Sequence, residues 1–172
     1  MVTLSLLVTS VVAVVGLVAL SAFFSSSESA IFSLPEEWVR EAAADGSADG
    51  ATLGELRSDP HRLLVTILVG NNVVNMAISS IVTLLVSEVF SPGAAVVVAT
   101  AGASALILVF GEIVPKSYGL GHARTWSRRV ARPLALVERA LGPVVVLFDA
   151  STRRLTALVG GDRGIEENLL DE

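Results

Sequence analysis

A carboxylate, a proline and the chain's one lysine lie within five residues, near the end of a long apolar run that begins near Ala94. These residues are Glu112, Pro115 and Lys116. The length of the run predicts a membrane-spanning helix, and an ionisable side chain within such a helix usually marks a pathway or a binding site. Because Pro115 has no N–H, the carbonyl of Gly111 loses its helical partner. A free carbonyl beside a carboxylate suits a hard cation such as Mg²⁺ or Na⁺, whereas the alternative is a proline kink with a glutamate that reaches the membrane surface.

Two hydroxyls and a second carboxylate follow the first apolar run of the chain. At helical spacing Ser21, Ser25 and Glu28 share one face. Hydroxyl oxygens are suitable neutral ligands for a hard cation. A serine in a membrane helix can instead bond a backbone carbonyl one turn earlier or allow close helix packing.

Three amides lie near the centre of the second apolar run, at Asn71, Asn72 and Asn75. Amides within a membrane helix are costly unless each finds a partner. Asn71 and Asn75 lie one turn apart on the same face, and their carbonyl oxygens suit Mg²⁺, Na⁺ or Ca²⁺. The alternative is hydrogen bonding between helices.

These groups need helices to position them, and the hydropathy pattern predicts an all-α membrane protein with three transmembrane helices. No basic residue precedes the first run, which favours a membrane helix over a signal peptide. A polar juxtamembrane hairpin with two short helices follows the first span, and two amphipathic belt helices with Pro133 between them follow the third. The second belt helix is expected to lie at the membrane interface rather than to form a fourth span. The expected spans are 2–24 with a continuation to Pro35, 62–90 and 94–120; the hairpin helices are 36–44 and 52–57, and the belt helices are 123–132 and 134–159.

Composition supports a membrane protein and argues against several other classes. Of 172 residues, 52% are hydrophobic and 17% are charged, well below the charged share of a soluble domain. The chain has no cysteine, its two histidines match no zinc spacing, and its net charge of −5 argues against nucleic-acid binding. No Ser–His pair, HExxH or GxSxG indicates an enzyme.

Basic residues indicate how the chain is oriented. Arginines follow the first and third spans, whereas the turn between the second and third spans has none. The positive-inside rule therefore predicts an external N-terminus and a cytoplasmic C-terminus. The strong preference for arginine over lysine favours a prokaryotic source, and hence the cell membrane of a prokaryote.

Three stretches together resemble the CNNM/CorC family: SAFFSSSESA at 21–30, LVGNNVVN at 68–75 and GEIVPK at 111–116. They match its transmembrane module, often called DUF21, and each lies in its own expected span. The resemblance covers residues 1–160. Residues 161–172 are interpreted as an acidic linker, beyond which the family normally continues into paired cytoplasmic CBS domains that are absent from this chain.

The resemblance implies a magnesium transporter or exporter, with Na⁺ as the exchanged ion, that works as a homodimer in the lipid membrane. A site with one carboxylate is expected to hold a partly dehydrated Mg²⁺ at membrane depth. Pro115 is expected to kink the third span. The alternative function is a non-transporting membrane anchor or cation sensor for an attached cytoplasmic domain. Carried over by motif, the cation ligands are Ser21, Ser25, Asn71, Asn75, the Gly111 carbonyl and Glu112.

Overall fold

The computed structural model describes residues 4–158, which form helices and no strand, as the all-α prediction requires. A long first helix is followed by a short hairpin, two further spans and a long final helix. In chain order they are α1 (Leu4–Phe32), α2 (Glu36–Ala44), α3 (Ala48–Ser58), α4 (Pro60–Ser87), α5 (Pro92–Leu106), the π-helix η1 (Ile107–Ile113), α6 (Val114–Gly121) and α7 (Ala123–Leu158).

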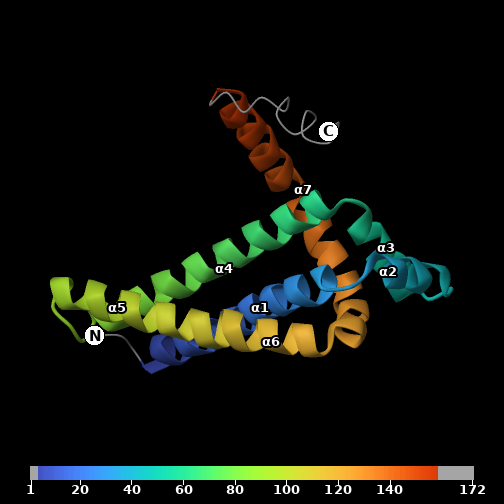
Figure 1. The fold of residues 1–172 in the computed structure, drawn as a ribbon. Coiled ribbons are helices and arrows are strands. Elements are labelled where there is room, and N and C mark those ends of the chain that lie inside the picture. The colour runs from blue at the N-terminus through green and yellow to red at the C-terminus, as the bar shows by residue number, and fades with distance from the viewer. Residues whose placement is uncertain (1–3, 159–172) are drawn as a thin grey trace, which may run out of the picture.

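Three stretches are long and apolar enough to cross a membrane: Leu4–Phe32, Pro60–Ser87 and Pro92–Gly121. The third comprises α5, η1 and α6 without a break. These stretches lie side by side, with the α4–α5 turn at one end of the bundle and the α2–α3 hairpin at the other (Figure 1). We call the α2–α3 hairpin and the part of α7 that packs on it, which includes Arg128 and Arg132, the belt. The prediction of three spans is confirmed.

Helix ends follow from local chemistry. The Asp59 side chain accepts a hydrogen bond of 3.0 Å from the Arg62 N–H and caps α4, and Pro60 occupies the first turn. Ser47 accepts a hydrogen bond of 3.1 Å from the Gly50 N–H in the same way. Because of this cap α3 begins at Ala48, earlier than the predicted 52–57.

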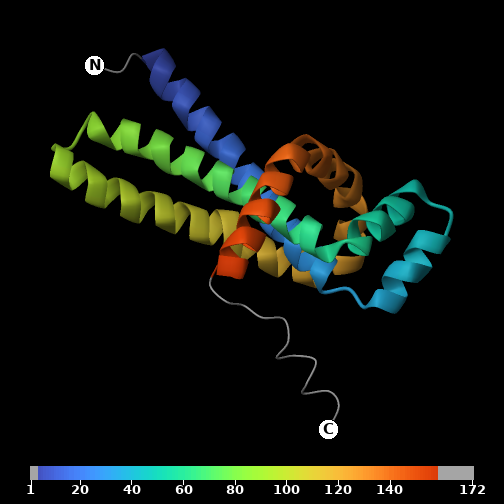
Figure 2. The same ribbon diagram turned by 90° about the horizontal axis from the view of Figure 1, so that it is seen from above.

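The C-terminal half of α1, from Ser21 onward, is the part that packs most closely. Its buried residues all lie between Ser21 and Ile31, and the N-terminal part leans away from α4 (Figure 2). A Cβ placed on Gly70 of α4 would lie 2.6 Å from the Phe24 ring, so only glycine permits this approach. The packed half of α1 is also the half that carries the serines and Glu28.

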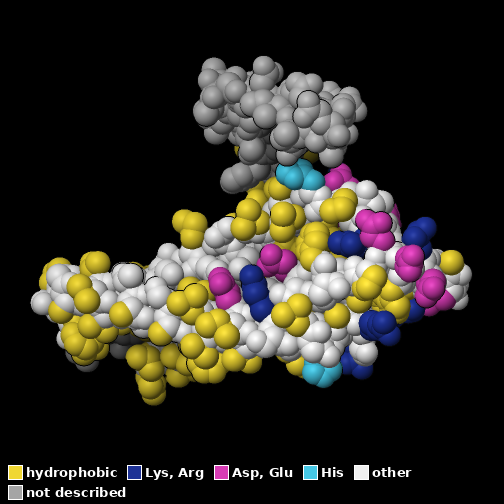
Figure 3. Space-filling model, in the orientation of Figure 1, with side chains coloured by type: hydrophobic (Ala, Val, Ile, Leu, Met, Phe, Trp, Pro, Cys, Tyr) yellow, Lys and Arg dark blue, Asp and Glu magenta, His cyan; other side chains and the backbone are white. Residues whose placement is uncertain are grey.

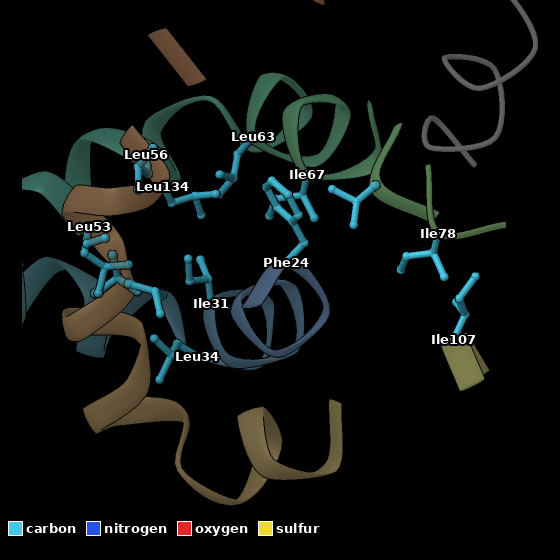
Figure 4. Close-up of a cluster of buried hydrophobic side chains, with 14 residues drawn as sticks. Phe24, Ile31, Leu34, Leu53, Leu56, Leu63, Ile67, Ile78, Ile107 and Leu134 are labelled. Carbon is cyan, nitrogen blue, oxygen red and sulfur yellow. The ribbon is translucent and has the colours of Figure 1, made fainter. Parts of the chain in front are cut away.

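A hydrophobic core joins the belt to the end of the bundle. Side chains from α1, α3, α4 and α7 point into it, and Ile78 and Ile107 extend the same cluster farther along the bundle (Figure 4). Burying this much apolar surface holds the belt against the spans. The residues at the junction include Ile31, Leu53, Leu56, Leu63, Ile67 and Leu134.

The final helix differs from the prediction. We expected helices at 123–132 and 134–159 with a break at Pro133, but α7 is one helix with Pro133 and Pro143 inside it. A proline removes one N–H and bends a helix, and it need not end the helix when flanking residues are held. Leu134 is held in this way, with none of its surface exposed, and α7 is visibly bent (Figures 1 and 2). Residues 159–172, including the predicted acidic linker, lie outside the described residues.

Candidate cation site

Three side-chain oxygen atoms meet between α1 and α4. The Ser21 hydroxyl lies 3.0 Å from Asn71 Oδ1 and 2.8 Å from Asn75 Oδ1. None of the surface of Ser21 is exposed. The hydroxyl has one proton to donate, so it cannot satisfy both carbonyl oxygens fully. The two amide oxygens therefore offer more acceptor capacity than the one hydroxyl proton between them can satisfy.

Glu112 fixes the orientation of one of these amides. The Asn75 Nδ2 donates to Glu112 Oε1 over 3.5 Å, which directs the Asn75 carbonyl oxygen toward Ser21. A flipped amide would set its oxygen against the carboxylate, two acceptors facing each other. At 3.5 Å the bond is long, so the carboxylate is only lightly held beside the oxygen cluster.

Ser25 lies one turn beyond Ser21 on the same helix face. Its side chain is fully buried, and its hydroxyl has no hydrogen-bond partner among the described residues. A buried hydroxyl without a partner costs about 1–3 kcal/mol, and such groups call for an explanation. The Ser25 hydroxyl makes no hydrogen bond with Ser21, Asn71 or Asn75, so only the spacing of one helical turn from Ser21 relates it to the cluster.

Gly111 allows η1 to reach α1 at this point. A Cβ at Gly111 would lie 2.7 Å from the Ser21 hydroxyl and 3.3 Å from Ser21 Cβ. Both distances are too short for any larger residue without displacing Ser21. The backbone of the third span therefore touches the oxygen cluster directly.

The π-helix modifies the predicted kink at Pro115. The Val114 N–H bonds the Val109 carbonyl, five residues earlier, and Pro115 has no N–H to continue this register. In an α-helix the Phe110 carbonyl would accept from the Val114 N–H, but that N–H bonds Val109 instead. In a π-helix it would accept from residue 115, but proline has no N–H. The Gly111 carbonyl lacks its α donor, as predicted. The helix continues through Pro115 as α6, so the proline ends the π segment rather than unwinding the span.

Other predicted polar groups lie elsewhere. Asn72 is exposed and donates to the Leu68 carbonyl over 2.9 Å in its own helix. Glu28 does not join the oxygen cluster; its carboxylate lies 3.4 Å from the Lys116 ammonium. This ion pair links α1 to α6. It could not be predicted from the sequence, because it depends on how the two helices pack.

A hydrogen bond between α7 and α1 could not be predicted from the residue pattern. The Trp126 indole N–H donates to the Ser26 hydroxyl over 3.0 Å, across 100 residues of sequence. A Cβ at Gly119 would clash with the Ser26 carbonyl oxygen. Ser26, the neighbour of Ser25, is therefore contacted both by α7, through Trp126, and by α6, through Gly119. A single tryptophan in an arginine-rich helix carried no signal of this contact.

Charged side chains of the belt are closely paired. Arg128 lies 2.6 Å from Asp45, and Arg132 lies 2.6 Å from Asp49. The Ser47 hydroxyl, then the Ser47 backbone N–H and Arg128, hydrogen-bond to Asp45 and lower its pKa from 3.8 to about 2. Charged side chains gather at this end of the molecule, and hydrophobic side chains cover much of the opposite end (Figure 3).

The chemistry of the oxygen cluster suits a hard cation. Among the described residues no three His, Cys, Asp or Glu side chains gather as a metal site, so a soft transition metal is poorly matched. Neutral hydroxyl, amide and carbonyl oxygens with one carboxylate are ligands for Mg²⁺, Na⁺ or Ca²⁺. The structure brings Ser21, Asn71, Asn75 and Gly111 together, and Glu112 contacts Asn75.

Comparison with known sequences gives a family match over nearly the whole chain. The family described as the Cyclin M (CNNM) transmembrane N-terminal domain matches residues 12–172. A chloroplastic DUF21 domain-containing protein of Arabidopsis thaliana is 41% identical over 128 residues, 74% of this chain. The UPF0053 inner membrane protein YfjD of Escherichia coli K12 is 32% identical over 145 residues, 82% of this chain.

These relatives are much longer than the matched region. The match covers 19% of the Arabidopsis protein and 33% of YfjD. A UPF0053 protein of Haemophilus influenzae is 33% identical over 141 residues, again 33% of its length. The chain thus spans a third or less of the length of these relatives.

Proposed function

Because this chain belongs to the family of the Cyclin M transmembrane N-terminal domain, we propose that it is the membrane domain of a magnesium transporter. It exports Mg²⁺, with Na⁺ as the exchanged ion, and it carries out no enzymatic reaction. The belt lies on the cytoplasmic side of a prokaryotic cell membrane with the N-terminus outside, as the arginine distribution favours.

One observation supports cation binding above the others. The Ser21 hydroxyl and two amide oxygens meet within 3.0 Å beside the unpaired, buried Ser25. Oxygen atoms with too few protons between them repel one another unless a positive charge joins them. A bound cation removes this deficit.

In this proposal each ligand has a distinct part. Glu112 supplies the negative charge, and Ser21, Ser25, Asn71 and Asn75 supply neutral oxygens. The Gly111 carbonyl, which has no α-helical donor because of Pro115, supplies a backbone oxygen. Mg²⁺ releases its water reluctantly and demands octahedral geometry, so a site with one carboxylate holds an ion that keeps part of its hydration shell.

We also propose that the domain works as a homodimer. Asn72 places an exposed amide on a face of α4 that carries exposed apolar residues, among them Val73 and Met76. Amides are poorly tolerated against lipid, and a second copy would cover this face. A mass in detergent twice that of the chain supports the dimer, and a monomer mass contradicts it.

The first experiment titrates Mg²⁺ into the detergent-purified chain, with Na⁺ as competitor. Wild type binds Mg²⁺ saturably, and Na⁺ displaces it. Glu112→Gln, which removes the one carboxylate of the site, weakens binding by about 100-fold, while Asn75→Ala weakens it by about tenfold.

Asn72→Ala is the matched control, since it removes an amide of the same helix that faces away from the cluster; its affinity stays at the wild-type value. Equal Mg²⁺ affinity in wild type and Glu112→Gln would remove Glu112 from the site. Vectorial Mg²⁺ flux in liposomes distinguishes a transporter from a non-transporting anchor or cation sensor, which binds the ion but moves none.

A further inference from the structure

An ion pair stands next to the proposed cation site. Lys116 Nζ lies 3.4 Å from Glu28 Oε2, and the two side chains are 42% and 33% exposed. Lys116 lies four residues after Glu112, and Glu28 lies three residues after Ser25. Each partner is therefore one helical turn from a proposed ligand. Figure 3 shows a small group of charged side chains part way along the bundle, apart from those of the belt.

The formal charges of this region do not balance. Along α1, η1 and α6 the charged residues are Glu28, Glu112 and Lys116, which give two negative charges and one positive charge. The positive charge stands at Glu28, whereas Glu112 has an amide contact of 3.5 Å. In this arrangement the carboxylate of the cation site is the one without an ammonium partner.

The same ammonium can reach either carboxylate. Residues four apart on a helix share a face, and glutamate followed by lysine at this spacing is the favourable order. The four-carbon stem of lysine is flexible, and its ammonium accepts many geometries. By this spacing Lys116 of α6 can turn toward Glu112 of η1 along the continuous third span, and it contacts Glu28 across to α1.

We propose that Lys116 is a tethered competitor of the divalent cation and that Glu28 holds it away from the site. This inference rests on the proposed cation site. While Lys116 pairs with Glu28, the Glu112 carboxylate is open to the cation. When that pair breaks, the ammonium turns to Glu112 and lowers the affinity for the cation. Glu28 is thus a positioning residue and makes no contact with the ion.

The test is Mg²⁺ binding by wild type and three variants, measured by titration calorimetry. Lys116→Met removes the competitor and tightens binding by about tenfold. Glu28→Gln frees the ammonium and weakens binding by about tenfold. In the double variant the effect of Glu28→Gln falls below about threefold, because no ammonium remains to be released.

Lys116→Arg is the matched control, since it keeps the positive charge, and its affinity stays close to wild type. Lys116→Gln repeats the charge removal with a polar side chain, in case methionine disturbs packing. An equal loss from Glu28→Gln with and without Lys116 would overturn the proposal, because Glu28 would then act on the cation directly. Unchanged or weaker binding in both Lys116→Met and Lys116→Gln would also overturn it.

Failure of this inference and failure of the proposed function give different results. Saturable Mg²⁺ binding by wild type that is weakened about 100-fold in Glu112→Gln, together with unchanged affinity in both Lys116→Met and Lys116→Gln, rejects the competitor alone. No saturable binding by wild type rejects both.

Discussion

Polar side chains of the belt and of the membrane bundle are paired to very different degrees. In the belt the ion pairs of Arg128 with Asp45 and of Arg132 with Asp49 are both 2.6 Å long. In the bundle Ser25 has no partner among the described residues, and Glu112 is held at 3.5 Å. The membrane interior tolerates polar groups without hydrogen-bond partners least, yet the incompletely paired side chains lie in the bundle.

The contrast separates polar groups that hold the fold from polar groups that await a ligand. A completed network contributes to structure and resists change. A network with too many acceptors is stable only if something else joins it. The two regions should therefore respond in opposite ways to substitution: belt variants change stability, and bundle variants change cation affinity.

The largest expected effect comes from Gly111→Ala. The new Cβ would lie 2.7 Å from the Ser21 hydroxyl, so Ser21 must move out of the cluster. Mg²⁺ affinity falls by roughly 100-fold, and overpacking costs about 1–3 kcal/mol of stability. Calorimetry and thermal unfolding measure the two effects.

Gly102→Ala is the control for this change, since nothing lies within 4 Å of a Cβ there. It leaves affinity unchanged and does not lower stability. Wild-type Mg²⁺ affinity in Gly111→Ala would show that the contact between η1 and Ser21 plays no part in the site.

A smaller effect sharpens the comparison within one helix. Ser25→Ala removes a buried hydroxyl that has no partner, so the stability without Mg²⁺ stays level or rises, by up to about 1–3 kcal/mol. Its Mg²⁺ affinity falls by about tenfold.

Ser27→Ala is the counterpart, because the Ser27 hydroxyl is also buried but donates to the Phe23 carbonyl over 2.6 Å. It loses about 1 kcal/mol of stability and keeps its affinity. If both serine variants changed stability and affinity alike, the distinction between structural and ligand-binding hydroxyls would fail.

The smallest effect is a pH dependence confined to the belt. The pKa of Asp45 is lowered from 3.8 to about 2 in the folded chain, so its stabilising contribution is complete above pH 3.8. This contribution is lost as the pH falls from 3.8 toward 2. Asp45→Asn removes the contribution, so the difference in melting temperature between wild type and variant narrows over that interval.

The cation affinity of Asp45→Asn at neutral pH equals that of wild type, since Asp45 lies outside the bundle. A constant difference in melting temperature from neutral pH down to pH 2 would contradict the assignment of the lowered pKa to Asp45.

Helical periodicity was sufficient to predict much of the arrangement. The one-turn spacing of Asn71 and Asn75 placed both amides on one face, and in the structure both meet Ser21. The missing N–H of Pro115 removes the α-helical donor of the Gly111 carbonyl, and whether that oxygen is free stays a prediction. Their roles as cation ligands stay predictions.

Features set by contacts between distant segments could not be predicted in this way. Ser21, Ser25 and Glu28 share a face by spacing, yet Glu28 pairs with Lys116 because α6 packs beside that end of α1. The continuity of α7 through Pro133 depends on burial against other helices, which no local pattern expresses.

The π segment has a geometric consequence for the third span. Each residue of a helix turns it by about 100°, and a π turn holds more residues than an α turn. The stretch Ile107–Ile113, which contains Glu112 and ends two residues before Pro115, is thus wound less tightly than an α-helix of the same length. Rewinding it as an α-helix would swing the following side chains around the helix axis while every residue stayed helical. The third span can in this sense change which face it presents to α1 by a twist alone, without bending.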